Sequence, residues 1–191
     1  FFNNIFGGGF STGSGNRRAT SRKGQNYAAD MEISLEEAYN GGVRIINVNG
    51  KKLRIKTKPG TKNKQRIKLS GKGSPGKNGG NAGDLIITIH ILPNSKFIRK
   101  GNNLHIDIEV NLYTAVLGGT IDVPTLQGIV KMTLPKGTQG GKTLRLKGKG
   151  MPEYGSESRF GDLYVKTIIT IPTNLNKEEE ELFVKLKNIE S

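Results

Sequence analysis

The chain has 191 residues, a formal net charge of +14 at pH 7 and no cysteine. This length suits one or two small domains, and the lack of cysteine excludes disulfide bonds and cysteine zinc sites. Because there is no run of about 18 apolar residues, the sequence predicts no membrane-spanning helix.

Residues 1–26 combine glycine with phenylalanine and then become rich in serine, threonine and arginine. Phenylalanine stands at positions 1, 2, 6 and 10, with no helical or strand period among the glycines. We predict a flexible linker here. The alternative is a regulatory peptide that occupies a groove elsewhere on the protein.

An internal repeat organises the rest of the chain. Three segments recur at an offset of 77 or 78 residues. Two copies of this length are too few for a solenoid, so we predict two homologous domains in tandem. The matching pairs are Ile33–Gly42 with Val110–Gly119, Gly60–Pro75 with Gly137–Pro152, and Gly83–Leu85 with Gly161–Leu163.

Within each copy, apolar residues alternate with polar ones at the two-residue period of half-buried strands. Two other segments are typical of single helical turns that end at a Gly-Gly pair. After Asn176, acidic residues and then apolar residues at helical spacing predict an amphipathic helix over 176–190. The predicted strands cover residues 52–56, 66–69, 85–91, 104–110, 129–134 and 162–171, and the helical turns cover 35–39 and 112–117.

The predicted fold is therefore mainly β, with two tandem homologous β-sandwich-like domains, short helical turns and a C-terminal amphipathic helix. We expect the linker at 1–26, the first domain at 27–99, the second domain at 100–174 and the terminal helix at 175–191.

Two motifs imitate nucleotide-binding sites. Gly71–Gly76 fits the dinucleotide fingerprint, but the glycine-rich residues that follow it cannot begin the helix that such a site needs. Gly141-Lys142-Thr143 resembles the end of a phosphate-binding loop, but Lys136 stands where the first glycine is required. We interpret both as turns.

No arrangement of residues indicates catalysis or a cofactor. His90 and His105 fall in predicted strands without a nearby cluster of metal ligands. A Ser-His-Asp triad needs no fixed order in sequence, but no serine lies in a Gly-x-Ser-x-Gly elbow. We expect no metal, no cofactor and no enzymatic activity.

A strongly basic stretch lies between Glu37 and Asp84, where no acidic residue occurs. The positive electrostatic field of such a stretch attracts nucleic acid, acidic peptide tails or anionic lipid. The alternative is a face that is merely solvated. The candidate anion-binding residues are Arg44, Lys52, Arg54 and Lys56.

The repeated motifs also form a joint pattern. They run as Ser34–Gly42, Gly71–Gly73, Gly83–Leu85, Phe97, Gly101–Leu104, Ala115–Gly119, Val123–Leu126, Leu134–Thr138 and Gly161–Val165. Together they resemble the two C-terminal domains of DnaJ-type co-chaperones, from about Ala28 to the end of the chain. The glycine- and phenylalanine-rich start resembles the linker that follows the J domain in that family.

Two features of that family are missing from this sequence: the His-Pro-Asp signature of a J domain and the cysteine-rich zinc module. The resemblance is therefore to the zinc-free subclass, which includes the bacterial curved-DNA-binding protein. We do not expect this chain alone to stimulate the ATPase of a heat-shock chaperone.

The resemblance implies a shallow hydrophobic groove on the first domain, lined by small or flexible side chains that accept varied sequences. An extended peptide there could pair with an exposed strand edge. The alternative is that Met31, Ile46 and Val48 are ordinary core. The implied peptide-binding residues are Ala29, Met31, Ile46, Val48 and Phe97.

The resemblance also implies two contacts with other chains. The basic residues near the groove would receive the acidic tail of a partner chaperone. The terminal helix would form a homodimer by burying Leu182, Phe183 and Leu186 against a second copy. The alternative is that this helix folds back on its own domain.

The expected function is thus that of a cytoplasmic, stress-related co-chaperone module. It would bind unfolded or non-native polypeptides and deliver them to a DnaK-type heat-shock chaperone. The alternative function is a basic DNA-binding module of the curved-DNA-binding-protein type, and an enzyme is a distant third.

Overall fold

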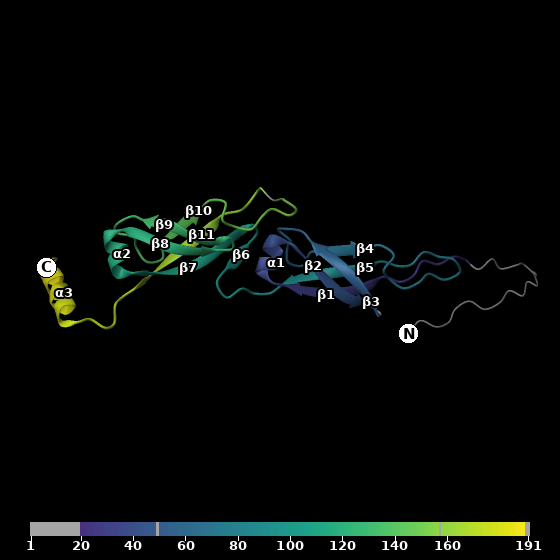
Figure 1. The fold of residues 1–191 in the computed structure, drawn as a ribbon, viewed down its shortest axis with the longest axis horizontal. Coiled ribbons are helices and arrows are strands. Elements are labelled where there is room, and N and C mark those ends of the chain that lie inside the picture. Colours follow the sequence, from purple (N-terminus) through teal and green to yellow (C-terminus); the bar gives the residue numbers. More distant parts are fainter. Residues whose placement is uncertain (1–19, 49, 157, 190–191) are drawn as a thin grey trace, which may run out of the picture. The chain divides into compact units, whose positions relative to one another are not determined.

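The computed structural model describes residues 20–48, 50–156 and 158–189, and within them the protein is mainly β (Figure 1). The predicted linker at 1–26 therefore falls largely outside the described residues. In the part that is described, no helix has the length and apolar character needed to cross a membrane.

The internal repeat is confirmed by the order of the elements, because strand, helix and four strands follow one another twice. Strand β6 (Ile98–Lys100) lies between the copies, and α3 (Lys177–Ile189) follows the second. The first copy holds β1 (Tyr27–Ile33), α1 (Leu35–Asn40), β2 (Gly42–Val48), β3 (Lys51–Thr57), β4 (Arg66–Leu69) and β5 (Leu85–Ile91). The second holds β7 (Asn103–Asn111), α2 (Leu112–Leu117), β8 (Gly119–Thr125), β9 (Gly128–Leu134), β10 (Thr143–Leu146) and β11 (Leu163–Thr170).

Each copy contains one larger sheet and one two-stranded ribbon. The strand order is β1-β5-β4 in the first copy. In the second copy it is β10-β11-β7-β6, so this sheet also contains the strand that lies between the copies. Strand β11 is parallel to β7, whereas β2 with β3 and β8 with β9 form antiparallel ribbons. Fully buried side chains come from both layers, for example Ile33 and Ile87 from the sheet and Ile55 from the ribbon. This is the expected sandwich-like arrangement.

The described residues fall into two compact units. One contains residues 20–29 and Arg66–Thr88, and the other contains Asp30–Gln65 and the described residues from Ile89 onward. The division passes through strands β1 and β5. The groove and the terminal helix described below belong to the second unit.

The dinucleotide-like motif Gly71–Gly76 and its equivalent around Gly150 in the second repeat each form a turn that closes the repeat. The N–H of Gly73 donates to the carbonyl of Gly83 at 2.8 Å, and the N–H of Gly150 donates to the carbonyl of Gly161 at 2.9 Å. A Cβ on Gly73 or on Gly150 would lie 2.6 Å from the carbonyl carbon of the partner glycine. Only glycine permits this approach, so the interpretation of Gly71–Gly76 as a turn is confirmed. Gly141 of the second motif also lies in a turn, with a φ of 80°.

An aspartate fastens the same turn in both repeats. Asp84 accepts the N–H of Gly71 at 3.0 Å, and Asp162 accepts the N–H of Gly148 at 2.9 Å. The backbone bond from Gly71, together with the ammonium groups of Lys23 and Lys68, holds the pKa of Asp84 well below its usual range. The Gly-Asp-Leu tripeptide therefore recurs in both repeats because its aspartate makes this hydrogen bond, and the recurrence needs no catalytic role to explain it.

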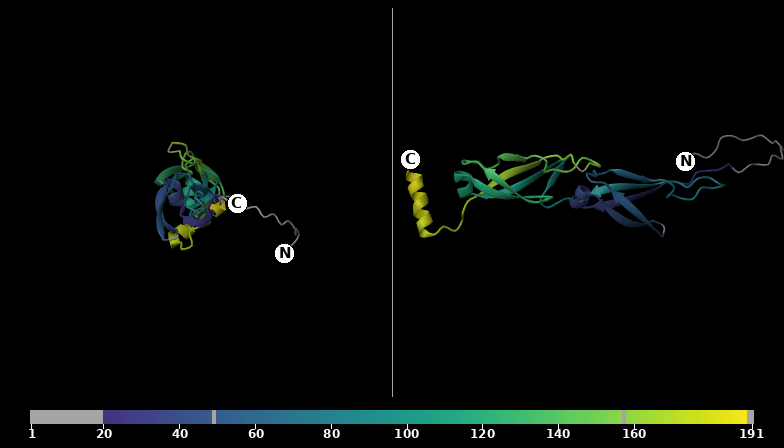
Figure 2. Two further views of the ribbon diagram at one scale, coloured as in Figure 1. Left: turned by 90° about the vertical axis from the view of Figure 1, so that its right-hand side faces the viewer. Right: turned by 45° about the horizontal axis from the view of Figure 1, so that its top comes forward.

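The predicted helical elements are confirmed. Helices α1 and α2 end at Gly41 and Gly118, whose φ angles of 71° and 81° favour glycine. Asn176 caps α3, since its Oδ1 accepts the N–H of Glu179 at 2.9 Å while the Glu179 carboxylate accepts the N–H of Asn176. Figures 1 and 2 show α3 at the end of a connection that leads away from β11.

Candidate functional site: a groove between two strand edges

Strands β1 and β2 each have one free edge within the described residues. Strand β1 pairs with β5 and β2 pairs with β3, but β1 and β2 do not pair with each other. A hollow of about 620 Å³ lies between them, lined by residues 30–32 of β1, residues 44–46 of β2 and His90 of β5. We call this hollow the β1–β2 groove. Because consecutive residues of both strands line it, both faces of each strand border the groove.

The floor of the β1–β2 groove is apolar. Met31 is only 5% exposed, and Ile46 is half-buried beside it, whereas Ile45 is 68% exposed. Ala29 and Val48 are half-buried and lie two residues from Met31 and Ile46, which places them on the same strand faces. Of the predicted peptide-binding residues, the structure thus brings Met31 and Ile46 together at one hollow.

Phe97 lines a different hollow. It is 7% exposed, its N–H donates to the Asn94 side chain at 3.0 Å, and it contributes to a space of about 300 Å³ beside Leu92 and Ile98. Both Leu92 and Ile98 are exposed. The structure therefore separates Phe97 from the pair formed by Met31 and Ile46.

Sequence reasoning missed four residues that line the β1–β2 groove: Asp30, Glu32, Ile45 and His90. The available signal was the position of Ile45 next to Ile46, because adjacent residues of a strand point to opposite faces and both faces border this groove. Nothing in the sequence indicated that His90 lies near Asp30, which is sixty positions away.

One ion pair and one histidine–carboxylate contact lie along the rim of the groove. Arg44 forms a fork with the Glu37 carboxylate, with Nη2 at 2.6 Å and Nε at 3.0 Å, and this contact lowers the pKa of Glu37. The backbone N–H of Ser34 lowers that pKa further. His90 Nε2 lies 2.9 Å from the Asp30 carboxylate.

Three of the four predicted anion-binding residues share one face. In the β2–β3 register, Lys52 is opposite Asn47, Arg54 is opposite Ile45, and Lys56 is opposite Val43, and all six are exposed. We call the side chains of Lys52, Arg54 and Lys56 the basic face. Arg44 is opposite Ile55 and so lies on the other face of the ribbon, where its charge is already paired with Glu37.

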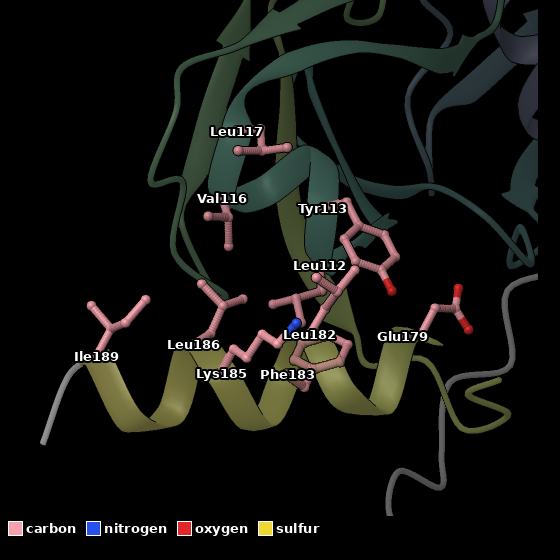
Figure 3. A pocket seen from close by; sticks show the side chains of 10 residues that line it. All are labelled: Leu112, Tyr113, Val116, Leu117, Glu179, Leu182, Phe183, Lys185, Leu186 and Ile189. Atoms are coloured by element: carbon pink, nitrogen blue, oxygen red, sulfur yellow. The ribbon is translucent and has the colours of Figure 1, made fainter. Parts of the chain in front are cut away.

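A second large hollow lies between α2 and α3. It measures about 620 Å³, and Figure 3 shows apolar side chains of the two helices pointing toward one another across it. Leu182 and Leu186 are more than half exposed, and the ring of Phe183 lies 6.2 Å from that of Tyr113. The lining residues are Leu112, Tyr113, Val116, Leu117, Glu179, Leu182, Phe183, Lys185, Leu186 and Ile189.

The duplicated sheet-and-ribbon architecture with a terminal helix places the protein in the class of tandem β-sandwich-like modules. Within that class, the chain belongs to the DnaJ C terminal domain family, whose model matches residues 27–172. The expected family is therefore confirmed.

Curated relatives match along most of the chain. The chain is 40% identical to "Chaperone protein DnaJ 2" of Thermus thermophilus, covering 97% of this chain and 63% of that protein. It is 34% identical to "Chaperone protein DnaJ" of Deinococcus proteolyticus, covering 97% and 57%. It is 36% identical to "Curved DNA-binding protein" of Coxiella burnetii, again covering 97% and 63%. The chain thus spans about three fifths of the length of these relatives.

Proposed function

We propose that this chain is the client-binding part of a DnaJ-type co-chaperone, which holds segments of non-native polypeptide in the β1–β2 groove. The observation that carries the proposal is a hollow with an apolar floor between two unpaired strand edges. The names of the chaperone relatives support the same function.

Binding in this groove would use backbone and side chains for different purposes. The N–H and C=O groups along the free edge of β1 or β2 would pair with an extended client, whatever its sequence. Ile46 and the flexible thioether of Met31 would accept apolar side chains of different shapes. This division suits a protein that must bind many unrelated chains.

The groove is tested by the change Ile45→Ser with Ile46→Ser. Removing two apolar side chains from the groove should weaken binding of an extended apolar peptide about tenfold or more. Fluorescence anisotropy with a labelled peptide measures this, and suppression of aggregation of an unfolded reporter should fall in parallel. Met31 and Phe97 are unsuitable first choices because both are nearly buried.

The matched control is Ile129→Ser. Ile129 is 73% exposed on β9 of the second repeat, compared with 68% for Ile45, and it does not line the groove. Peptide affinity equal to that of the unchanged protein in both variants would show that clients bind elsewhere.

We also propose that the basic face receives the acidic tail of a DnaK-type chaperone, to which clients are delivered. Lys52, Arg54 and Lys56 form no ion pair among the described residues, whereas Arg44 does. Cations without a local counterion remain available to a partner's carboxylates.

A second candidate function, DNA binding, is favoured by the same ribbon. Two-stranded β-ribbons fit the major groove of B-DNA, and three basic side chains on one face of β2–β3 could contact phosphates. One of the relatives carries the name "Curved DNA-binding protein".

The acidic-tail and DNA proposals are both tested by reversing the charges of the basic face with Lys52→Glu, Arg54→Glu and Lys56→Glu. Binding of an acidic peptide should be lost if the face receives a tail, and salt-sensitive binding of duplex DNA should be lost if it contacts phosphates. Reversal of three exposed lysines of the second repeat, Lys131, Lys136 and Lys142, gives the same net charge and should have little effect. If the two triple variants bind a probe equally well, the basic face is not its site.

We propose finally that α3 mediates a homodimer through the apolar side chains of the α2–α3 hollow. Leu182 and Leu186 remain largely exposed in the single chain, and burying them against a second copy would remove apolar surface from water.

A further inference from the structure

The outer face of the β2–β3 ribbon, which carries the basic face, also carries exposed apolar side chains. Val43 is 45% exposed and Ile45 is 68% exposed. The register places Val43 opposite Lys56 and Ile45 opposite Arg54, and Lys52 lies further along the same face. Each of these two apolar side chains therefore has a cation as its direct neighbour across the strands.

The second repeat does not reproduce this surface. Its equivalent ribbon is β8–β9, and on the corresponding face one aspartate stands opposite one lysine, so the charges balance. The pairs across that face are Thr120 with Thr133, Asp122 with Lys131, and Pro124 with Ile129. Because the same ribbon forms without them, the cations and exposed apolar residues of the first repeat are not required by the fold.

The carboxylates near this face do not cancel its charge. Its three cations form no ion pair among the described residues. The groove that Ile45 also lines contains the carboxylates of Asp30 and Glu32, which belong to β1. Even if both of these carboxylates act at full strength, the three cations outnumber them. The outer face of the ribbon therefore attracts anions.

The exposed apolar residues favour one kind of anionic partner. Phosphate or carboxylate groups alone satisfy the cations but offer no apolar surface to Val43 and Ile45. An anionic bilayer offers both, because the boundary of the acyl chains lies just below its charged headgroups. Lysine and arginine suit such an interface, since their aliphatic stems lie along apolar surface while their charged ends reach phosphates.

We infer that the outer face of the β2–β3 ribbon binds the surface of an anionic lipid bilayer. Val43 and Ile45 enter the boundary between headgroups and acyl chains, and the basic face contacts the lipid phosphates. This inference goes beyond the proposed function and does not rest on client binding in the β1–β2 groove. A membrane surface would compete with an acidic tail or with DNA for the same three cations.

A fluorescent reporter tests whether the face enters the bilayer. The chain contains no tryptophan, so Ile45→Trp introduces a single indole at the face. Vesicles of phosphatidylcholine with phosphatidylglycerol should shift its emission to shorter wavelength, and brominated acyl chains should quench it. Vesicles of phosphatidylcholine alone should do neither, because they lack net charge.

The matched reporter is Ile129→Trp, since Ile129 is 73% exposed on the outer face of the equivalent ribbon. Its emission should stay that of an indole in water. Vesicle binding without a shift in the Ile45→Trp protein would overturn the inference, and so would equal shifts in both proteins.

Val43→Ser with Ile45→Ser separates lipid binding from simple attraction of anions, because it removes the apolar side chains and keeps every charge. Co-sedimentation should show about tenfold weaker binding to vesicles that contain phosphatidylglycerol. Binding of duplex DNA and of an oligoglutamate peptide should not change. Vesicle affinity equal to that of the unchanged protein, or an equal loss for all three probes, would overturn the inference.

The matched control is Ile168→Ser with Ile129→Ser. Ile168 is 43% exposed, close to the value for Val43, and both residues lie in the second repeat. This control should keep the vesicle affinity of the unchanged protein. If it weakens vesicle binding as much as the Val43 and Ile45 changes do, the contact is not specific to the β2–β3 ribbon and the inference is wrong.

Reversal of the basic face with Lys52→Glu, Arg54→Glu and Lys56→Glu should remove vesicle binding. Each cation near an anionic membrane raises the affinity about fivefold, so the three act together as a large factor. Added salt should weaken binding in the unchanged protein for the same reason. Vesicle binding that survives the reversal would mean that another surface, such as the exposed apolar face of α3, contacts the membrane instead.

Discussion

At the scale of single residues, Asp84 shows how one carboxylate stabilises a turn made almost entirely of glycine. It accepts the N–H of Gly71, and Lys23 and Lys68 lie 3.0 and 3.1 Å from its second oxygen. Its side chain is nearly buried, so the ionised form depends on these partners.

Replacing Asp84 by Asn should lower thermal stability at pH 7, and this difference should shrink as the solution becomes acidic. The pKa of Asp84 is depressed in the folded protein, so the stability it contributes is present above its unfolded value of about 3.8 and is lost as the pH falls below it. Melting curves recorded from about pH 7 down to about pH 2 measure the effect. Asp107, which is exposed, changed to Asn is the control, and parallel curves for the two variants would contradict the prediction.

A comparison of Gly60 with its equivalent in the second repeat, Gly137, distinguishes the cost of backbone strain from the cost of a steric contact. Both have positive φ, at 78° and 71°, so alanine is strained at either position. A Cβ on Gly60 would also lie 2.5 Å from the carbonyl oxygen of Pro152, whereas a Cβ on Gly137 meets nothing within 4 Å.

Gly60→Ala should therefore destabilise the protein more than Gly137→Ala. Strain alone should cost about 1 kcal/mol in each variant, and the contact at position 60 adds to it. Urea denaturation of both variants provides the comparison. Equal losses of unfolding free energy would mean that the backbone near Pro152 relaxes without cost.

At the scale of elements, the strands that the sequence predicted are those with a simple alternation. Residues 85–91 and 104–110 alternate buried and less buried side chains along their length, and both are strands. Strands β1 and β2 were not predicted. The polar and small residues of β1 weaken its pattern, and β2 carries apolar residues on both faces, since Ile45 and Ile46 are adjacent.

The same ambiguity explains why the candidate groove was only partly predictable. The family pattern supplied Met31 and Ile46, which line the groove, but a pattern in one chain cannot reveal which strand edges stay unpaired. The lining of the groove also depends on Asp30, Glu32 and the distant His90 meeting at one hollow. That meeting is a property of sheet order, which the local period does not encode.

At the scale of the whole molecule, the proposed homodimer depends on the exposed apolar face of α3, so the oligomeric state of the protein tests it. Leu182→Glu with Leu186→Glu should convert a dimer to a monomer in sedimentation equilibrium, because each change would place a charge in the apolar contact. Val184→Glu is the control, since Val184 is 53% exposed, close to the 51% of Leu182, but does not line the hollow between α2 and α3. A monomeric unchanged protein, or a dimer that survives both leucine changes, would contradict the proposal.

The parallel pairing of β7 with β11 also has a consequence for the order of folding. The Thr170 hydroxyl donates to the Val110 carbonyl, 60 positions away, and the two strands run side by side through this region. Ordering a loop of this length carries an entropy cost before any contact compensates for it, so such pairings form slowly. On the ribosome, β7 would leave the exit tunnel long before its partner and would wait with an open edge. The second repeat should therefore acquire resistance to proteases only after Thr170 has been released from the tunnel.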